Sequence, residues 1–547
     1  MADSEQSTAQ PDGFLGHPRG LMTLFFTELW ERFSYYGMRA FLVFYIVAAK
    51  DKGGLGKSEA TAGIIYAMYV SLVYLMSLPG GWLADRYLGQ RKAVLIGGII
   101  IMLGHLTLAI PGEASFLPGL AIIVLGTGLL KPNVSTIVGQ LYGKEDIRRD
   151  AGYTIYYMGI NVGAAIAPFI CGYLANDDSF RAHLRHWGID PNKAWHFGFA
   201  SAAVGMAFGV AQFWLGSRKM GDAGLRPTRP AASASGVKLP PFALKVVVGT
   251  AALIAAFCAW RIGSAGANDA TIADSFGVGL ALIAVAVFWI MHREVAITDD
   301  ERRRVRAMGV LFFGCLSFFG IFEQAGSTIN LFTAHYVQPK LFFVKFDATW
   351  YQSINAGWIL ILGPIFAAMW IALAKARREP DSVTKFALGV LLSGLAFFVL
   401  LPTVSTIAND GRISGYWLVG FYFVSTLGEL CLSPVGLSVM NKLAPVRLEG
   451  FVMGIWFLAI SIGGYIAGRA GEEVGGLANR LQWGHPVTLV TEAKDHAITV
   501  STTYPAGMFW LLILFTAIVA ALLFAMAGPV KRMLAAGDLP AAKVVND

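Results

Sequence analysis

The chain contains fourteen apolar runs that are each long enough to cross a lipid bilayer, and this repetition limits the fold more than any other feature. A hydrocarbon core of about 30 Å requires roughly 20 apolar residues in a helix. Because lipid offers the backbone no hydrogen-bond partners, each run is expected to form an α-helix. The sequence therefore predicts an all-α membrane protein with fourteen transmembrane helices. The runs lie at residues 21–49, 60–83, 93–111, 116–140, 151–174, 197–216, 242–262, 272–292, 306–336, 348–375, 384–403, 414–440, 449–470 and 505–528.

Two of these runs, 21–49 and 306–336, are longer than a simple span, which predicts tilted helices or helices that extend beyond the lipid. Composition agrees with a membrane protein. Hydrophobic residues make up 56% of the 547 residues and charged residues only 14%, with a mean hydropathy of +0.58. The first twenty residues lack the basic and apolar regions of a secretory signal peptide, so we expect the first helix to be retained.

The cysteines give no sign of a disulfide framework. Cys171, Cys258, Cys315 and Cys431 all lie inside expected spans, and none has a partner in an outer loop.

Basic residues concentrate in alternate loops, and the positive-inside rule makes the richer side cytoplasmic. Both termini are therefore expected in the cytoplasm. The net charge of +8 then reflects topology, and no nucleic-acid partner is expected. The richer side carries Arg86, Arg91, Lys92, Lys144, Arg148, Arg149, Arg218, Lys219, Arg226, Arg229, Arg302, Arg303, Arg304, Arg306, Lys375, Arg377, Arg378, Lys531 and Arg532.

A segment rich in Pro, Gly, Ser and Ala divides the expected helices into six, two and six. Two six-helix halves are typical of the major facilitator superfamily, in which substrate binds between the halves. The segment GGWLADRYLGQRK at 80–92 resembles that superfamily's loop motif, although a basic turn is the simple alternative. The expected parts are a cytoplasmic tail at 1–20, a six-helix bundle at 21–216, a cytoplasmic linker at 217–241, two additional helices at 242–292, a second six-helix bundle at 293–530 and a cytoplasmic tail at 531–547.

A charged residue at mid-bilayer costs at least about 2.5 to 3.5 kcal/mol on insertion scales, and seven such residues stand out. Four belong to the first run, in which Glu28, Glu31, Arg32, Tyr35, Tyr36 and Arg39 share one helical face. An ion-pair ladder within the helix would account for Glu28 and Arg32, but not for the tyrosines or Arg39. The other three are Lys131, Glu323 and Glu429.

The remaining polar residues of the spans suggest a site between the halves. Lys131 precedes Pro132, and a snorkelling lysine is its competing interpretation. Cations dominate the first half and carboxylates the second, so a zwitterion fits between them. Four acids face three bases, and burial favours the neutral form of a surplus carboxylate, which makes proton coupling a hypothesis.

The segment ELWERFSYY at 28–36 matches the ExxERFxYY motif of the proton-dependent oligopeptide transporter family. The segments at 130–142, 148–164, 322–327 and 428–439 also resemble this family, so the likeness spans both halves. The resemblance implies symport of di- and tripeptides with protons by alternating access, in a bacterial inner membrane. It implies no cofactor beyond the coupling proton, and we expect a monomer.

Roles for single residues follow from the same resemblance. Glu28, Glu31 and Arg32 would form the proton-coupling cluster. Arg39 and Lys131 would hold the peptide carboxylate, and Glu429 the amino group. The pairs Arg39–Glu323 and Lys131–Glu429 would act as outer and inner gates. The rest of the pocket would comprise Tyr35, Tyr74, Asn161 and Asn355, with walls from Phe318 and Trp456.

The sequence departs from some relatives. Phe322 stands where some carry a second glutamate, and the second span has no histidine, so the proton must rest on carboxylates. A drug or nitrate transporter on the same scaffold and a membrane receptor remain alternatives. An enzyme is not expected, because the chain has no nucleophile elbow, metal-ligand spacing or phosphate loop.

Overall fold

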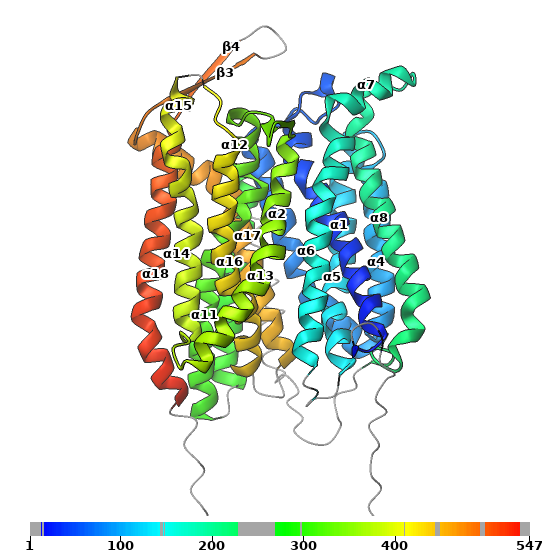
Figure 1. Ribbon diagram of the computed structural model, residues 1–547, viewed down its shortest axis with the longest axis vertical. Coiled ribbons are helices and arrows are strands. Elements are labelled where there is room, and N and C mark those ends of the chain that lie inside the picture. Colours follow the sequence, from blue (N-terminus) through cyan, green and yellow to red (C-terminus); the bar gives the residue numbers. More distant parts are fainter. Residues whose placement is uncertain are drawn as a thin grey trace, which may run out of the picture.

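The computed structural model is a bundle of long, nearly parallel helices (Figure 1). It describes residues 13, 16–142, 146, 148–227, 269–295, 298–409, 411–443, 449–492 and 498–535. Within this part, thirteen of the fourteen expected runs coincide with helices, which confirms the all-α membrane fold. The run at 242–262 lies outside the described residues, so the count of fourteen stays a prediction.

The helices form two groups that pack mainly within themselves. The N-terminal bundle consists of α1 (Gly20–Val47), α2 (Glu59–Leu75), α3 (Ser77–Leu83), α4 (Gln90–Leu108), α5 (Glu113–Gln140), α6 (Arg149–Asn176), α7 (Asp178–His186) and α8 (Ala194–Gly216). The C-terminal bundle consists of α11 (Asp299–Phe322), α12 (Thr328–Tyr336), α13 (Gln352–Lys375), α14 (Ser382–Leu400), α15 (Val404–Ala408), α16 (Tyr416–Leu443), α17 (Glu449–Leu481) and α18 (Pro505–Ala535).

Eleven helical stretches of the described residues are long and apolar enough to cross a membrane. The first helix, α1, is not among them, because every window of 18 residues in it contains at least three charged side chains. Its charges are nevertheless buried, because they contact side chains of other helices, such as Tyr156 of α6 and Tyr66 of α2. The bundle thus shields the charged side chains of α1 from lipid, to which an isolated α1 would expose them at high cost.

The run at 306–336 is divided and is not one long tilted helix. After α11, residues Glu323–Gly326 form a 3-10 turn, and α12 begins at Thr328. A Cβ on Gly326 would lie 2.0 Å from the Tyr66 hydroxyl and 2.5 Å from Arg39 Nε, so only glycine fits there. The break therefore coincides with the place where α1 and α2 of the other bundle contact this segment.

The two bundles meet along α2 with α17 and along α6 with α13. Small residues allow close approach at the first seam. A Cβ on Gly468 of α17 would lie 2.5 Å from Ala67 Cβ of α2, and one on Gly464 would lie 2.6 Å from Val70. Lower along the seam, the hydroxyls of Ser71 and Ser461 lie 2.8 Å apart. Such packing is typical of helices that associate within membranes.

Two short hairpins lie beyond the spans, and the sequence analysis did not predict them. Strands β1 (Lys340–Leu341) and β2 (Val344–Lys345) pair antiparallel, as do β3 (Val487–Glu492) and β4 (Ile498–Thr503). The longer hairpin is rich in Val, Ile and Thr, which favour strands. It lies at the same end of the molecule as α7, opposite the start of α1 and the end of α18 (Figure 1). We call these the α7 end and the terminal end.

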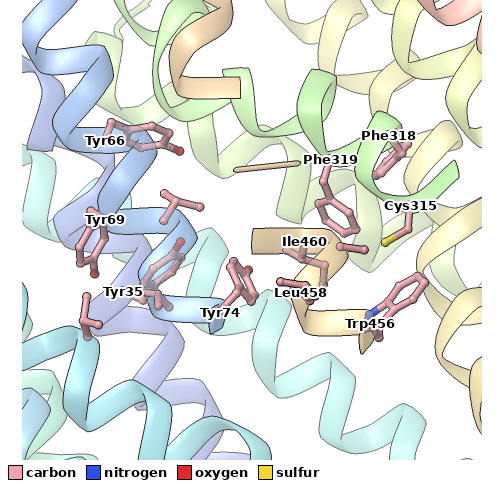
Figure 2. Close-up of a cluster of buried hydrophobic side chains, with 14 of the residues drawn as sticks. Tyr35, Tyr66, Tyr69, Tyr74, Cys315, Phe318, Phe319, Trp456, Leu458 and Ile460 are labelled. Carbon is pink, nitrogen blue, oxygen red and sulfur yellow. The ribbon is translucent and has the colours of Figure 1, made fainter. Parts of the chain in front are cut away.

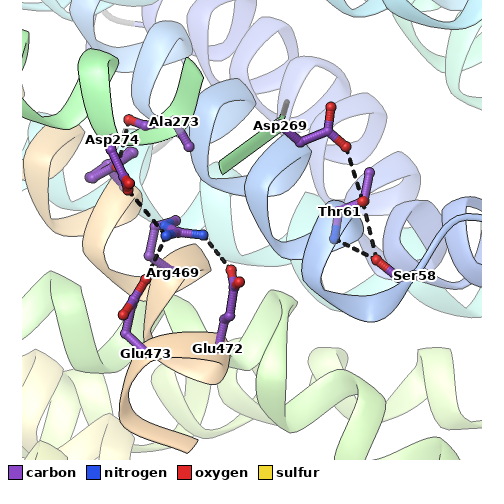
Figure 3. Close-up of polar contacts among 9 residues, drawn as sticks. Ser58, Thr61, Asp269, Ala273, Asp274, Arg469, Glu472 and Glu473 are labelled. Atoms are coloured by element: carbon purple, nitrogen blue, oxygen red, sulfur yellow. Dashed lines mark hydrogen bonds and ion pairs between the residues drawn. The ribbon is translucent and has the colours of Figure 1, made fainter. Parts of the chain in front are cut away.

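An additional helix, α10 (Asp269–Ile290), packs on both α2 and α17 at the seam. Figure 3 shows its contacts near the α7 end: Asp274 pairs with Arg469 of α17, and Asp269 accepts a hydrogen bond from Thr61 of α2 at 3.0 Å. Arg469 also pairs with Glu472 and Glu473 of its own helix. Helix α10 is thereby attached to both bundles.

Candidate functional site

The polar face of α1 forms a buried cluster of one arginine and two glutamates. Arg32 Nε lies 3.2 Å from Glu28 Oε1, and Arg32 Nη2 donates to Glu31 Oε1 at 2.6 Å. All three side chains are almost fully buried. A single cation is therefore shared by two carboxylates in a buried site, where an unbalanced charge is costly.

Higher on the same helix, Arg39 reaches across to the C-terminal bundle. Its Nη2 lies 2.8 Å from Oε2 of Glu323, and both side chains are buried. The guanidinium also lies 5.7 Å from the ring centre of Tyr66, whose hydroxyl donates to the Glu323 carbonyl at 3.4 Å. The break after α11 thus brings Glu323 to α1, and the sequence-predicted pair Arg39–Glu323 is formed.

Lys131 of α5 contacts aromatic rings. Its Nζ lies 3.7 Å from the ring centre of Tyr74 and 6.0 Å from that of Phe457. Among the described residues no carboxylate forms an ion pair with it, so the sequence-predicted pair Lys131–Glu429 is absent from this structure. A cation over an aromatic face gains roughly 0.5 to 2 kcal/mol. This is less than the cost of removing an ammonium group from water, which an ionic partner would have to offset. Lys131 is thus available to bind an anion.

Glu429 of α16 is held by neutral groups. Asn355 of α13 donates to Glu429 Oε2 at 3.1 Å and to Thr426 Oγ1 at 2.9 Å. Within the described part of the chain, Glu429 has no cationic partner. The amide fixes the carboxylate but does not neutralise it, so this site can receive a cation.

The aromatic side chains near the interface between the bundles point in different directions. Figure 2 shows Tyr35 and Tyr74 on the N-terminal side of the interface, with Phe318 and Trp456 among the apolar side chains of the other bundle. Trp456 packs edge-on against Phe386 of α14, at 6.2 Å between ring centres. Its neighbour Phe457 instead stacks on Tyr74 across the interface, at 6.4 Å. The ring opposite Tyr74 and Lys131 is therefore that of Phe457.

Phe318 is fully buried and stacks on Phe322, with ring centres 5.3 Å apart. Asn161 donates to the Tyr157 carbonyl of its own helix at 3.0 Å. Among the described residues, neither Phe318 nor Asn161 makes a direct contact with a charged side chain of the site. The structure thus brings together the charged residues and tyrosines that the sequence singled out, and places Phe318 in a supporting layer.

Three residues that the sequence analysis did not single out contact the site. Tyr156 of α6 donates to Glu28 Oε2 at 2.7 Å, Tyr66 lies against Arg39, and Asn330 of α12 donates to the Ala40 carbonyl of α1 at 2.9 Å. Tyr156 lies inside the expected span at 151–174, where nothing in the sequence distinguishes it from a packing tyrosine. Its partner could not be deduced, since 128 residues separate the two in sequence.

Towards the α7 end, further polar contacts join the two bundles. His335 lies 2.8 Å from Glu59, and Lys345 lies 3.0 Å from Asp177. Burial disfavours the charged form of Asp177, yet hydrogen bonds from Ser179 and Lys345 outweigh this and hold its pKa below the ordinary value. Polar contacts therefore join the two bundles from the level of Arg39 to the α7 end.

The fold and the site together define a class, that of helical membrane transporters whose two bundles enclose opposite charges at their interface. The POT family model matches residues 91–471. A di-/tripeptide transporter of Lactococcus lactis subsp. cremoris is 39% identical over 460 residues, covering 82% of this chain and 88% of the relative. A peptide transporter of Yersinia enterocolitica is 37% identical over 485 residues, covering 86% and 91%.

A crystal structure of the peptide transporter POT in complex with sulfate is 38% identical, with a TM-score of 0.77 over 96% of this chain and 98% of that one. The chain therefore belongs to the POT family. The family predicted from ELWERFSYY and the expected major facilitator fold are both confirmed.

Proposed function

We propose that the protein is a proton-coupled symporter that carries di- and tripeptides into the cell by alternating access between its two bundles. Family membership supports the substrate class, since the relatives above are named as peptide transporters. The observation that carries the proposal is the state of Lys131 and Glu429. They belong to opposite bundles, and neither has an ionic partner within the described residues.

A zwitterionic peptide supplies both missing partners. Its carboxylate would bind Lys131, with Arg39 as a second cation, and its ammonium would bind Glu429. Tyr35, Tyr74, Asn161 and Asn355 would contact the backbone, and the aromatic wall would include Phe457 beside Tyr74, with Phe318 and Trp456 behind it. Because a peptide satisfies two partly buried charges at once, its binding favours the conformation that brings the bundles together around it.

The cluster of Glu28, Glu31 and Arg32 would carry the coupling proton. One proton on either glutamate leaves one carboxylate for one guanidinium, which balances the buried charge. No other cofactor is required. The pair Arg39–Glu323 would be the outer gate, closed in this structure, and Lys131–Glu429 the inner gate, which closes when the outer gate opens. The terminal end would face the cytoplasm of a bacterium, with the protein acting as a monomer in the inner membrane.

The proposal is tested by uptake of labelled dialanine into proteoliposomes. Wild type and Glu31→Gln are compared with and without an inward proton gradient. We expect uphill accumulation by the wild type only with the gradient, and exchange of dialanine without uphill accumulation by Glu31→Gln. Absence of any dialanine uptake by the wild type would refute the peptide assignment. Uphill accumulation by Glu31→Gln would refute only the role of Glu31.

A further inference from the structure

The two glutamates of the α1 cluster have different partners. Both oxygens of Glu31 contact the Arg32 guanidinium. Glu28 shares only one oxygen with Arg32, and its other oxygen, Oε2, accepts a hydrogen bond from the Tyr156 hydroxyl at 2.7 Å. Glu28 is therefore the acid that is only half bound by the cation, and a neutral hydroxyl completes its surroundings.

A tyrosine hydroxyl can serve a carboxyl group in both protonation states. It donates to the carboxylate, and it can accept from the protonated acid. The bond to the carboxylate is charge-assisted and therefore the stronger of the two. Glu28 thus keeps its position when its charge changes, which a partner that only donates could not ensure.

The other charged and titratable groups around Glu28 come from three helices. Glu31 and Arg32 lie on α1, Tyr156 on α6, and Lys131 of α5 acts on Glu28 over a longer distance. Helices α1 and α6 pack against each other within one bundle. The contact between Tyr156 and Glu28 is therefore kept when the bundles move relative to each other, unlike the pair Arg39–Glu323 between the bundles.

The aromatic ring of Tyr156 packs separately from the hydrogen bond that its hydroxyl makes with Glu28. It belongs to an apolar cluster with Leu24, Val134 and Met206. A phenylalanine at 156 can fill the same space and removes only the hydroxyl. We infer that Tyr156 is a positioning residue for proton coupling, whose hydroxyl holds Glu28 in place and favours its charged form. This inference rests on the proposed proton coupling by the α1 cluster.

The test measures gradient-driven dialanine uptake in proteoliposomes as a function of pH for wild type and Tyr156→Phe. Loss of the hydroxyl removes a bond that is stronger to the charged acid, so protonation becomes easier. We expect the pH midpoint of uptake to move upward by about one unit, equivalent to about 1.4 kcal/mol. Exchange of dialanine without a gradient should be unchanged, because exchange requires no net movement of protons.

Two controls separate positioning from packing. Tyr153→Phe removes a hydroxyl of the same helix that donates to the Ser135 carbonyl at 3.2 Å, and its pH midpoint should stay at the wild-type value. In a Glu28→Gln background, Tyr156→Phe should cause no further loss of dialanine uptake or exchange, because the hydroxyl then has no charged acid to hold. An unchanged midpoint in Tyr156→Phe, an equal shift in Tyr153→Phe, or a further loss in the Glu28→Gln background would overturn the inference. Uptake by the wild type that ignores the proton gradient would instead refute the proposed function.

Discussion

Two arginine clusters of this molecule have nearly the same composition but opposite surroundings. Arg32 of α1 pairs with Glu28 and Glu31 of its own helix, and Arg469 of α17 pairs with two glutamates of its own helix and with Asp274 of α10. Both arginines are buried. The carboxylates around Arg32 are 1% and 3% exposed, whereas those around Arg469 are 39% to 59% exposed.

The difference shows that burial of the acids, not the presence of an arginine with acids at helical spacing, decides what such a cluster can do. Water screens the carboxylates around Arg469, so their charges act only weakly on one another. Around Arg32 there is little water, so each proton changes the electrostatic balance of the whole cluster. A coupling site needs the second condition, while attachment of α10 needs only the first.

The largest effect is expected for Arg32→Gln. Removal of the cation leaves two buried carboxylates together, and breaking a buried ion pair costs about 3 to 5 kcal/mol of unfolding free energy. Thermal unfolding in detergent measures the loss. The variant Glu28→Gln/Glu31→Gln/Arg32→Gln removes all three charges and should recover most of the stability. Equal stability of the single and triple variants would show that the cluster is not governed by charge balance.

A smaller effect is expected for Lys131→Gln, which extends the comparison to a partly buried cation that has no carboxylate partner among the described residues. Because no ion pair among the described residues is broken, the melting temperature should change little. The KM for dialanine should rise roughly 10- to 100-fold, since a charged hydrogen bond to the peptide carboxylate is lost. Uptake kinetics provide the measurement, with Lys131→Arg as the control that retains the charge. A large loss of stability with an unchanged KM would contradict this assignment.

Arg469→Gln should have a modest effect of about 1 kcal/mol on stability, because its partners are exposed. Its dialanine uptake and pH midpoint should match the wild type. Salt provides a second measurement: the melting temperature of the wild type should approach that of Arg469→Gln as ionic strength rises, since a Debye length of about 10 Å at 0.1 M screens exposed pairs. A changed pH midpoint in Arg469→Gln would remove the distinction between the two clusters.

The smallest effect is expected at Asp177, a buried acid near the α7 end whose pKa is lowered and whose partner Lys345 is half exposed. A carboxyl group with a folded pKa below its ordinary value of about 3.9 stabilises the protein above that pH and loses this effect as the pH falls through the folded value. Asp177→Asn should therefore cost less than about 1 kcal/mol equally at pH 7 and pH 5. Unfolding measured at pH 3 should show a smaller difference. A stability difference between wild type and Asp177→Asn that grows as the pH falls would contradict the lowered pKa of Asp177.

The length of the apolar runs was sufficient to predict the spans, and helical periodicity was sufficient to predict the charged face of α1, because both depend only on residues close in sequence. The break at Glu323–Gly326 was not predicted, since it arises from contact with Tyr66 and Arg39 of the other bundle. Trp456 and Phe457 show that the direction of a single side chain is harder to predict from sequence than the helix that carries it. Neighbours on a helix differ by about 100° in direction, and sequence alone did not show that Phe457 is the one facing Tyr74.

The contact between Ser71 and Ser461 has a practical consequence for trapping the transporter. Their hydroxyls lie 2.8 Å apart across the seam between α2 and α17. Cysteines at both positions would place two thiols within reach of each other, and mild oxidation would join the bundles covalently with the Arg39–Glu323 pair formed. Reduction would release them, so a chemist could stop the cycle in one conformation and restart it on demand.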